Sequence, residues 1–122
     1  MSLSYNELLS NIKRQSKRLS NSLNTPLRKS QSILAMSVYQ CSDWNELRDS
    51  LKSNSFDNQL LLLASLQPNA DLFLYKFLNE NLNTISINLK DNFSIDLSND
   101  ELEKLIVNLF GVELYEFKEK IQ

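Results

Sequence analysis

The fold is decided first by residues 4–23, SYNELLSNIKRQSKRLSNSL. Ser4-x-x-Glu7 has the spacing of a capping box, in which each side chain bonds a free backbone amide at the start of a helix. Apolar residues then recur at helical spacing along one side of the segment: Leu8, Ile12, Leu19 and Leu23. We therefore predict an amphipathic helix from about residue 5 to 22.

Two further helices are predicted directly after this one. Thr25-Pro26 has the order of an N-cap and a first helical residue, which predicts a helix over residues 26–39. Its inward residues are expected to be Leu27, Leu34 and Val38. A third helix is predicted to begin near Asp43, because Asp43-x-x-Glu46 also has capping-box spacing. Its inward residues are expected to be Trp44, Leu47 and Leu51.

The second half of the chain carries the remaining helix signals. A Leu-rich helix over about residues 57–66 should end before Pro68, since a residue preceding Pro is disfavoured in helical conformation. Helical spacing resumes over residues 69–82. Ser98-x-x-Glu101 is a second capping box, and Gly111 stands where the end of that helix favours a left-handed residue. A final amphipathic helix would bury Leu114, Phe117 and Ile121.

Between these helices the apolar period changes from about 3.6 to 2. Apolar residues alternate over residues 84–89 and again over residues 93–97, and Lys90-Asp91-Asn92 between them are turn-forming residues. This pattern predicts a β-hairpin near residues 84–97, whose open strand edge would offer a route to a homodimer. The fold class is therefore predicted to be mostly α, a single-domain bundle of about seven helices with one β-hairpin.

Composition excludes several classes of site. The 122 residues include no His, one Cys and one Gly. The commonest acid/base group and metal ligand are thus absent, and a single Gly cannot build a phosphate-binding glycine loop. We predict no enzymatic activity, no cofactor and no metal site. No segment has the pattern of a membrane span or an export signal, and the lone Cys41 suits a reduced, cytoplasmic setting.

Charge divides the domain into two sections. Residues 1–53 hold eight Lys and Arg against four Asp and Glu, a balance of +4, and form the predicted basic three-helix module. Residues 54–122 hold five against eleven, a balance of −6. The linker between them is predicted at Ser53-Asn54-Ser55. Such asymmetry indicates either an interaction surface or attraction between the two sections within the fold.

The first section also resembles a known type of module. Its characteristic residues are Lys17-Arg18-Leu19, Pro26-Leu27 with Gln31, Leu34-Ala35, and Ser42-x-Trp44-Asn45-Glu46-Leu47. In this pattern residues 13–51 resemble a small helical module of bacterial plasmid, phage and glyoxalase-related proteins. Gln40-Cys41 stands where that module has Gly-Tyr, and Gly accepts a positive φ that Gln reaches only at a cost. The resemblance implies an accessory role on a mobile genetic element and no catalytic residues.

Two binding surfaces are predicted from the charges. Nucleic-acid phosphates could be neutralised by cations of the first three helices, which form a helix-turn-helix-like unit: Lys13, Arg14, Lys17, Arg18, Arg28, Lys29, Arg48 and Lys52. A basic protein surface could be met by acidic residues of the second section: Asp96, Asp100, Glu103, Glu113, Glu116 and Glu119. Overall acidity favours the protein partner, a host or defence complex that the chain would inhibit in an anti-defence or antitoxin-like role. Nucleic-acid binding is the alternative.

Two single residues complete the prediction. Trp44 is expected to anchor the core, because it shares a helical face with Leu47 and Leu51. Cys41 precedes a helix N-terminus, a position that could lower the pKa of its thiol. Without a His to act as base, a catalytic role for Cys41 is not predicted.

Overall fold

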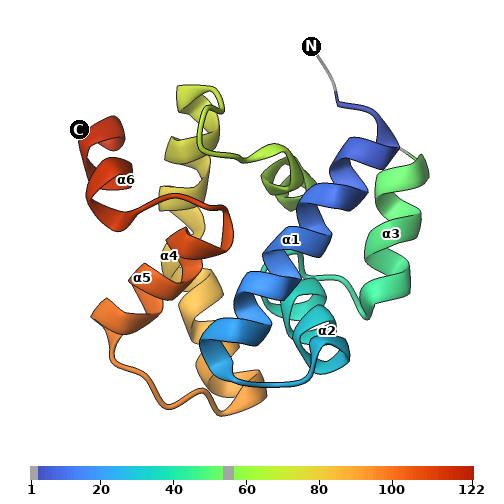
Figure 1. Ribbon diagram of the computed structural model, residues 1–122, viewed down its shortest axis with the longest axis horizontal. Helices are drawn as coiled ribbons and strands as arrows, with labels where there is room; N and C mark the ends of the chain where they lie inside the picture. Colours follow the sequence, from blue (N-terminus) through green and yellow to red (C-terminus); the bar gives the residue numbers. More distant parts are fainter. Residues whose placement is uncertain (1–2, 54–56) are drawn as a thin grey trace.

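The computed structural model describes residues 3–53 and 57–122, and within these ranges it contains helices and no strand (Figure 1). The helices are α1 (Tyr5–Leu23), α2 (Leu27–Ser37), α3 (Trp44–Ser53), the 3-10 helix η1 (Gln59–Ser65), α4 (Leu72–Phe93), α5 (Asn99–Leu109) and α6 (Leu114–Ile121). The mostly helical fold class is therefore confirmed. The linker predicted at Ser53-Asn54-Ser55 lies, beyond Ser53, outside the described residues.

The helix starts confirm two of the predicted capping boxes. Ser4 and Ser98 each accept a hydrogen bond from the backbone amide three residues later, and the Glu7 and Glu101 carboxylates accept one from the amide of the capping residue. At α3 the box is rearranged. Asp43 Oδ1 accepts from the Glu46 amide at 2.7 Å, but the Glu46 carboxylate bonds Ser42.

Helix ends require left-handed residues at two notable places. Gly111 follows α5 with a φ of 78°, as its position in the sequence predicts. Gln40 follows α2 with a φ of 54°, at the position that the predicted resemblance compares with Gly. The turn is held by the amide of Cys41, which donates to the carbonyl of Ala35 at 2.8 Å. Gln thus takes the conformation that Gly would adopt more readily.

One cluster of buried apolar side chains draws on all seven described helices. α1 packs against α2, α3, η1 and α5, and α4 packs against α2, η1, α5 and α6. Leu34, Val38, Leu47 and Leu51 are buried as predicted, and Trp44 is half-buried against the cluster. Leu27 is 48% exposed, so its predicted inward position is wrong; it lies in the first turn of α2, where the helix has just begun.

The predicted β-hairpin near residues 84–97 is wrong. Residues 84–93 continue α4, and the described part of the chain contains no strand, so the strand edge proposed for a homodimer is absent too. The buried residues Leu78, Leu82, Ile85 and Leu89 keep helical spacing. Over residues 84–89 the period-2 alternation arises because Ile87, on the outer face, is an exposed Ile at 47%, and residues 94–97 form the irregular connection after α4. Lys90-Asp91-Asn92 form the last helical turn, which ends at Ser94 with a φ of 54°.

None of the described helices combines the length and the apolar character needed to cross a membrane.

A buried polar network ties η1 to α1 and to the end of α2. Gln15 is 1% exposed; its Oε1 accepts from the Tyr39 hydroxyl at 2.6 Å, and its Nε2 donates to the Leu63 carbonyl at 3.4 Å. One turn earlier, Asn11 Nδ2 donates to the Ala64 carbonyl at 2.9 Å. Because buried polar groups are stable only when bonded, these contacts fix where η1 sits on α1.

Candidate nucleic-acid interface

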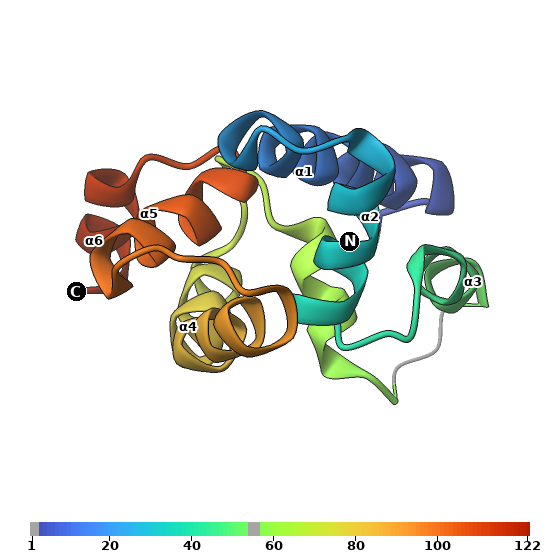
Figure 2. The same cartoon turned by 90° about the horizontal axis from the view of Figure 1, so that it is seen from below.

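Five exposed cations lie on α1 and on the first turn of α2. We call them the basic surface: Lys13, Arg14, Lys17, Arg28 and Lys29. Figure 2 shows α1 and the start of α2 along the same edge of the molecule, at the top of the view, joined by the short connection after Leu23. The structure therefore places these five predicted residues, all exposed, on two helices that pack against each other.

The exposure of the α1 cations follows from what lies on the other side of the helix. Ile12, Ser16 and Leu19 are fully or almost fully buried, which holds that face of α1 against the core. Lys13, Arg14 and Lys17 lie on the opposite side of the helix and are exposed, whereas Asn11 and Gln15 share the buried side. Arg14 donates to Asn11 Oδ1 on the same helix and stays exposed.

The stretch of chain that carries the basic surface contains no carboxylate, although α3, with Glu46 and Asp49, packs against α1 and α2. Residues 8–42 hold six Lys and Arg and no Asp or Glu. Glu7, just before this stretch, is engaged with the backbone of Ser4 at the start of α1. The charge balance of +4 over residues 1–53 hides this uniformly basic stretch, because the three other carboxylates of the section all lie within residues 43–49.

Arg18 differs from the other predicted α1 cations, because it is half-buried and bonds to another helix. Its Nη1 donates to the Leu109 carbonyl at 2.9 Å, in the last turn of α5. A cation there also complements the negative end of the helix dipole. A Cβ added at Gly111 would lie 3.0 Å from Arg18 Nη2, so the guanidinium fits against a residue without a side chain. Burial, and after it the charge of Arg14, lower the pKa of Arg18.

Replacing Arg18 by Ala is expected to destabilise the protein by about 1–2 kcal/mol, because the Leu109 carbonyl loses a charged donor. Lys17→Ala removes a cation one residue away that is exposed, and should stay within about 0.5 kcal/mol of the wild type. Urea denaturation of both variants measures the difference. Equal stabilities would contradict a structural role for Arg18.

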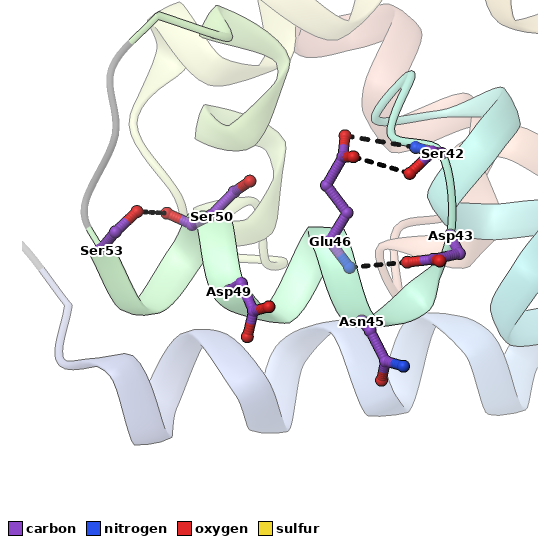
Figure 3. Close-up of a pocket in the computed structure, with 7 residues that line it drawn as sticks. All are labelled: Ser42, Asp43, Asn45, Glu46, Asp49, Ser50 and Ser53. Carbon is purple, nitrogen blue, oxygen red and sulfur yellow. Dashed lines mark hydrogen bonds between the residues drawn. The ribbon is translucent and has the colours of Figure 1, made fainter.

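The cations of α3 do not extend the basic surface. Arg48 is half-buried and donates to Asn45 Oδ1 at 2.8 Å, while its Nε has no hydrogen-bond partner among the described residues. Lys52 is exposed in the last turn. The outer side of α3 borders an open depression of about 590 Å³ (Figure 3). Its lining is polar and acidic: Ser42, Asp43, Asn45, Glu46, Asp49, Ser50 and Ser53.

Carboxylates in this depression are mainly helix caps. Glu46 accepts from the Ser42 hydroxyl at 2.6 Å and from its amide at 3.2 Å, and Asp43 caps the Glu46 amide. Within residues 3–53 and 57–122, no group of three His, Cys, Asp or Glu side chains could hold a metal ion. An acidic face of this kind repels phosphate, so α3 is a poor reader of a nucleic-acid groove.

The acidic candidates are divided between two ends of α5. Asp96 precedes the helix and Asp100 lies in its first turn, about 15 Å along the axis from the α5–α6 connection. Glu113 occupies the N-cap position of α6 without a side-chain capping bond, and α6 also carries Glu116 and Glu119. Lysines interrupt this second group: Lys118 forms an ion pair with Glu103 at 3.2 Å, and Lys120 lies over the Tyr75 ring, 5.2 Å from its centroid.

Cys41 has the opposite character to the one its position suggests. Burial is the main cause that raises the pKa of its thiol to about 11, and the charges of Glu46 and Asp43 raise it further. The thiol is therefore protonated at neutral pH and a weak nucleophile. The helix N-terminus does not dominate here, because α3 is already capped by carboxylates.

Comparison with protein-family models, with curated proteins and with solved structures finds no match to this chain. The resemblance of residues 13–51 to a plasmid and phage module stays a prediction. Any functional argument therefore rests on the surfaces described above.

Proposed function

We propose that the protein is a non-enzymatic nucleic-acid-binding protein whose basic surface contacts backbone phosphates. The observation that carries the proposal is the concentration of five exposed cations on α1 and α2, within a stretch of 35 residues, 8–42, that has no carboxylate. Local charge of one sign attracts a polyanion even when the whole chain has a net charge of −2. The overall acidity therefore does not argue against this surface.

Backbone contact is favoured over base reading. In helix-turn-helix proteins the second helix of the motif enters the major groove. The corresponding helix here is α3, whose outer face carries Asp43, Glu46 and Asp49, and whose Arg48 is half-buried. Contacts limited to α1 and α2 would bind unrelated sequences about equally, as phosphate contacts carry no sequence information.

Replacing Lys13, Arg14 and Lys17 together by Gln should weaken binding to unrelated duplexes about equally. Three lost phosphate contacts should lower the slope of log K against log salt by about 2.7 and reduce affinity roughly tenfold or more at low salt. Fluorescence anisotropy with a labelled duplex at two salt concentrations measures both quantities. Stability should fall by no more than about 1 kcal/mol, because all three side chains are exposed and the hydrogen bond from Arg14 to Asn11 Oδ1 is the one described contact that is changed.

A matched control removes the same charge from the other section of the chain. Lys76, Lys104 and Lys118 are exposed and lie outside the basic surface, so replacing all three by Gln should keep the wild-type salt slope. Equal losses of affinity in the two triple variants would show that only net charge matters, which contradicts a localised phosphate surface.

The partner favoured by composition, a host or defence protein complex, remains a second proposal. It rests on the −6 balance of residues 54–122, and its surface would be centred on Glu113, Glu116 and Glu119 of α6. Affinity capture with the wild type and with these three residues replaced by Lys tests it: a partner lost only in that variant would support it. An accessory role on a mobile genetic element and a cytoplasmic setting belong to both proposals.

A further inference from the structure

The basic surface has no aromatic side chains. Residues 6–37, which include all of α2 and all but the first residue of α1, contain no Phe, Trp or Tyr. Tyr5 is half-buried against the core and Tyr39 is fully buried. The most exposed aromatic residues of the described chain, Phe73 and Tyr115, belong to α4 and α6.

The absence of aromatic side chains affects whether the basic surface binds single strands or duplexes. Proteins that bind single strands combine cations with aromatic rings on which bases stack, and each stacked base contributes about 1–3 kcal/mol. A surface of Lys, Arg, Ser and Asn offers bases no aromatic platform, and the guanidinium planes of Arg14 and Arg28 are its only flat cationic groups. It has only the phosphate contacts, and these release more counterions from a duplex (about 0.9 per contact) than from a single strand (about 0.7).

The rigid helix backbone beneath the basic surface also favours a duplex over a single strand. Lys13 and Lys17 are one helical turn apart, about 6 Å along the axis of α1. Arg28 and Lys29 lie in the first turn of α2, which begins at Leu27, shortly after α1 ends. The buried Gln15 and its bond to Tyr39 fix the backbone of α1 at this point. Cations carried on a rigid helix backbone can meet the regular phosphates of a duplex without ordering the backbone, whereas a flexible strand must be ordered before it can meet them.

We infer that the ligand is a double-stranded nucleic acid, held through its phosphates, and that single strands bind more weakly. The inference rests on the proposed function, and names the class of nucleic acid for the same surface. DNA and RNA duplexes share the phosphate chemistry on which it depends.

The test compares four labelled probes with the intact chain in fluorescence anisotropy: an oligothymidine of about 20 nucleotides, a mixed-sequence single strand, and DNA and RNA duplexes of about 20 base pairs. At least one duplex should bind roughly tenfold or more tightly than both single strands, with a steeper salt slope. Single strands that bind as tightly as both duplexes would overturn the inference and leave the proposed function standing. Failure to bind any probe would overturn the proposed function itself.

A gain-of-function variant tests the reason for the preference. Asn21 is exposed on α1, one turn beyond Lys17, so Asn21→Trp would add a stacking platform beside the cations. Single-strand affinity should then rise about fivefold or more, while duplex affinity stays within about twofold. Asn21→Ala is the control and should change neither. An unchanged ratio in the Trp variant would overturn the inference that missing aromatic residues set the preference.

Discussion

Replacing Ile87 by Pro is expected to destabilise the protein by about 3 kcal/mol or more. Ile87 lies in the interior of α4, and Pro there removes the helical hydrogen bond to the carbonyl of Asn83 and clashes with that carbonyl. The side chain itself is 47% exposed, so little packing is lost. Urea denaturation followed by circular dichroism gives the free energy of unfolding.

The matched control is Ile87→Ala, which keeps the backbone and removes the exposed side chain. Ala is a better helix former than Ile, so this variant should stay within about 0.5 kcal/mol of the wild type. The difference between the Pro and Ala variants isolates the helical backbone at residue 87. A difference below about 1 kcal/mol would contradict a continuous helix over residues 72–93.

Replacing Gln15 by Ala is expected to cost about 2–4 kcal/mol, the second large effect. The Tyr39 hydroxyl would lose its acceptor inside the core, and the Leu63 carbonyl would lose a donor. Burial raises the pKa of Tyr39, so the hydroxyl stays protonated and must donate. Ser10→Ala, on the exposed face of the same helix, is the control and should stay within about 0.5 kcal/mol.

A double variant separates the unpaired hydroxyl from the lost packing. Gln15→Leu with Tyr39→Phe removes both partners of the 2.6 Å hydrogen bond and keeps apolar volume in place. This pair should be more stable than Gln15→Ala, since replacing both partners by apolar groups leaves no orphaned donor. A Gln15→Ala variant as stable as the wild type would contradict the buried network.

Local signals predict the helix starts well because capping chemistry needs only neighbouring residues. Ser4 with Glu7 and Ser98 with Glu101 form the bonds that their spacing predicts, and Gly111 takes its left-handed conformation. The failure near residues 84–97 has a different origin. Ile85 and Leu89 fit both a helix and a strand, and only the exposure of Ile87 on the folded molecule separates the two readings.

Long-range contacts limit how much of the candidate site could be predicted. The cations of α1 and α2 were found from their spacing, because a basic face opposite an apolar stripe is a property of one helix. Arg18 looks identical in the sequence, yet its partner is the Leu109 carbonyl, 91 residues later. Asn11 and Gln15, which share the side of α1 that holds Ile12 and Leu19, are the sequence signal for the buried network.

The most direct test of the central claim is a salt-dependent titration of the wild-type chain with two DNA duplexes of unrelated sequence. Both should bind with similar affinity, and five phosphate contacts predict a slope of log K against log salt of about −4.5. Non-specific binders with a Kd of about 10⁻⁴ to 10⁻⁶ M at physiological salt tighten at lower salt. Absence of binding at about 50 mM salt and about 10 µM protein would contradict a phosphate-binding surface on α1 and α2.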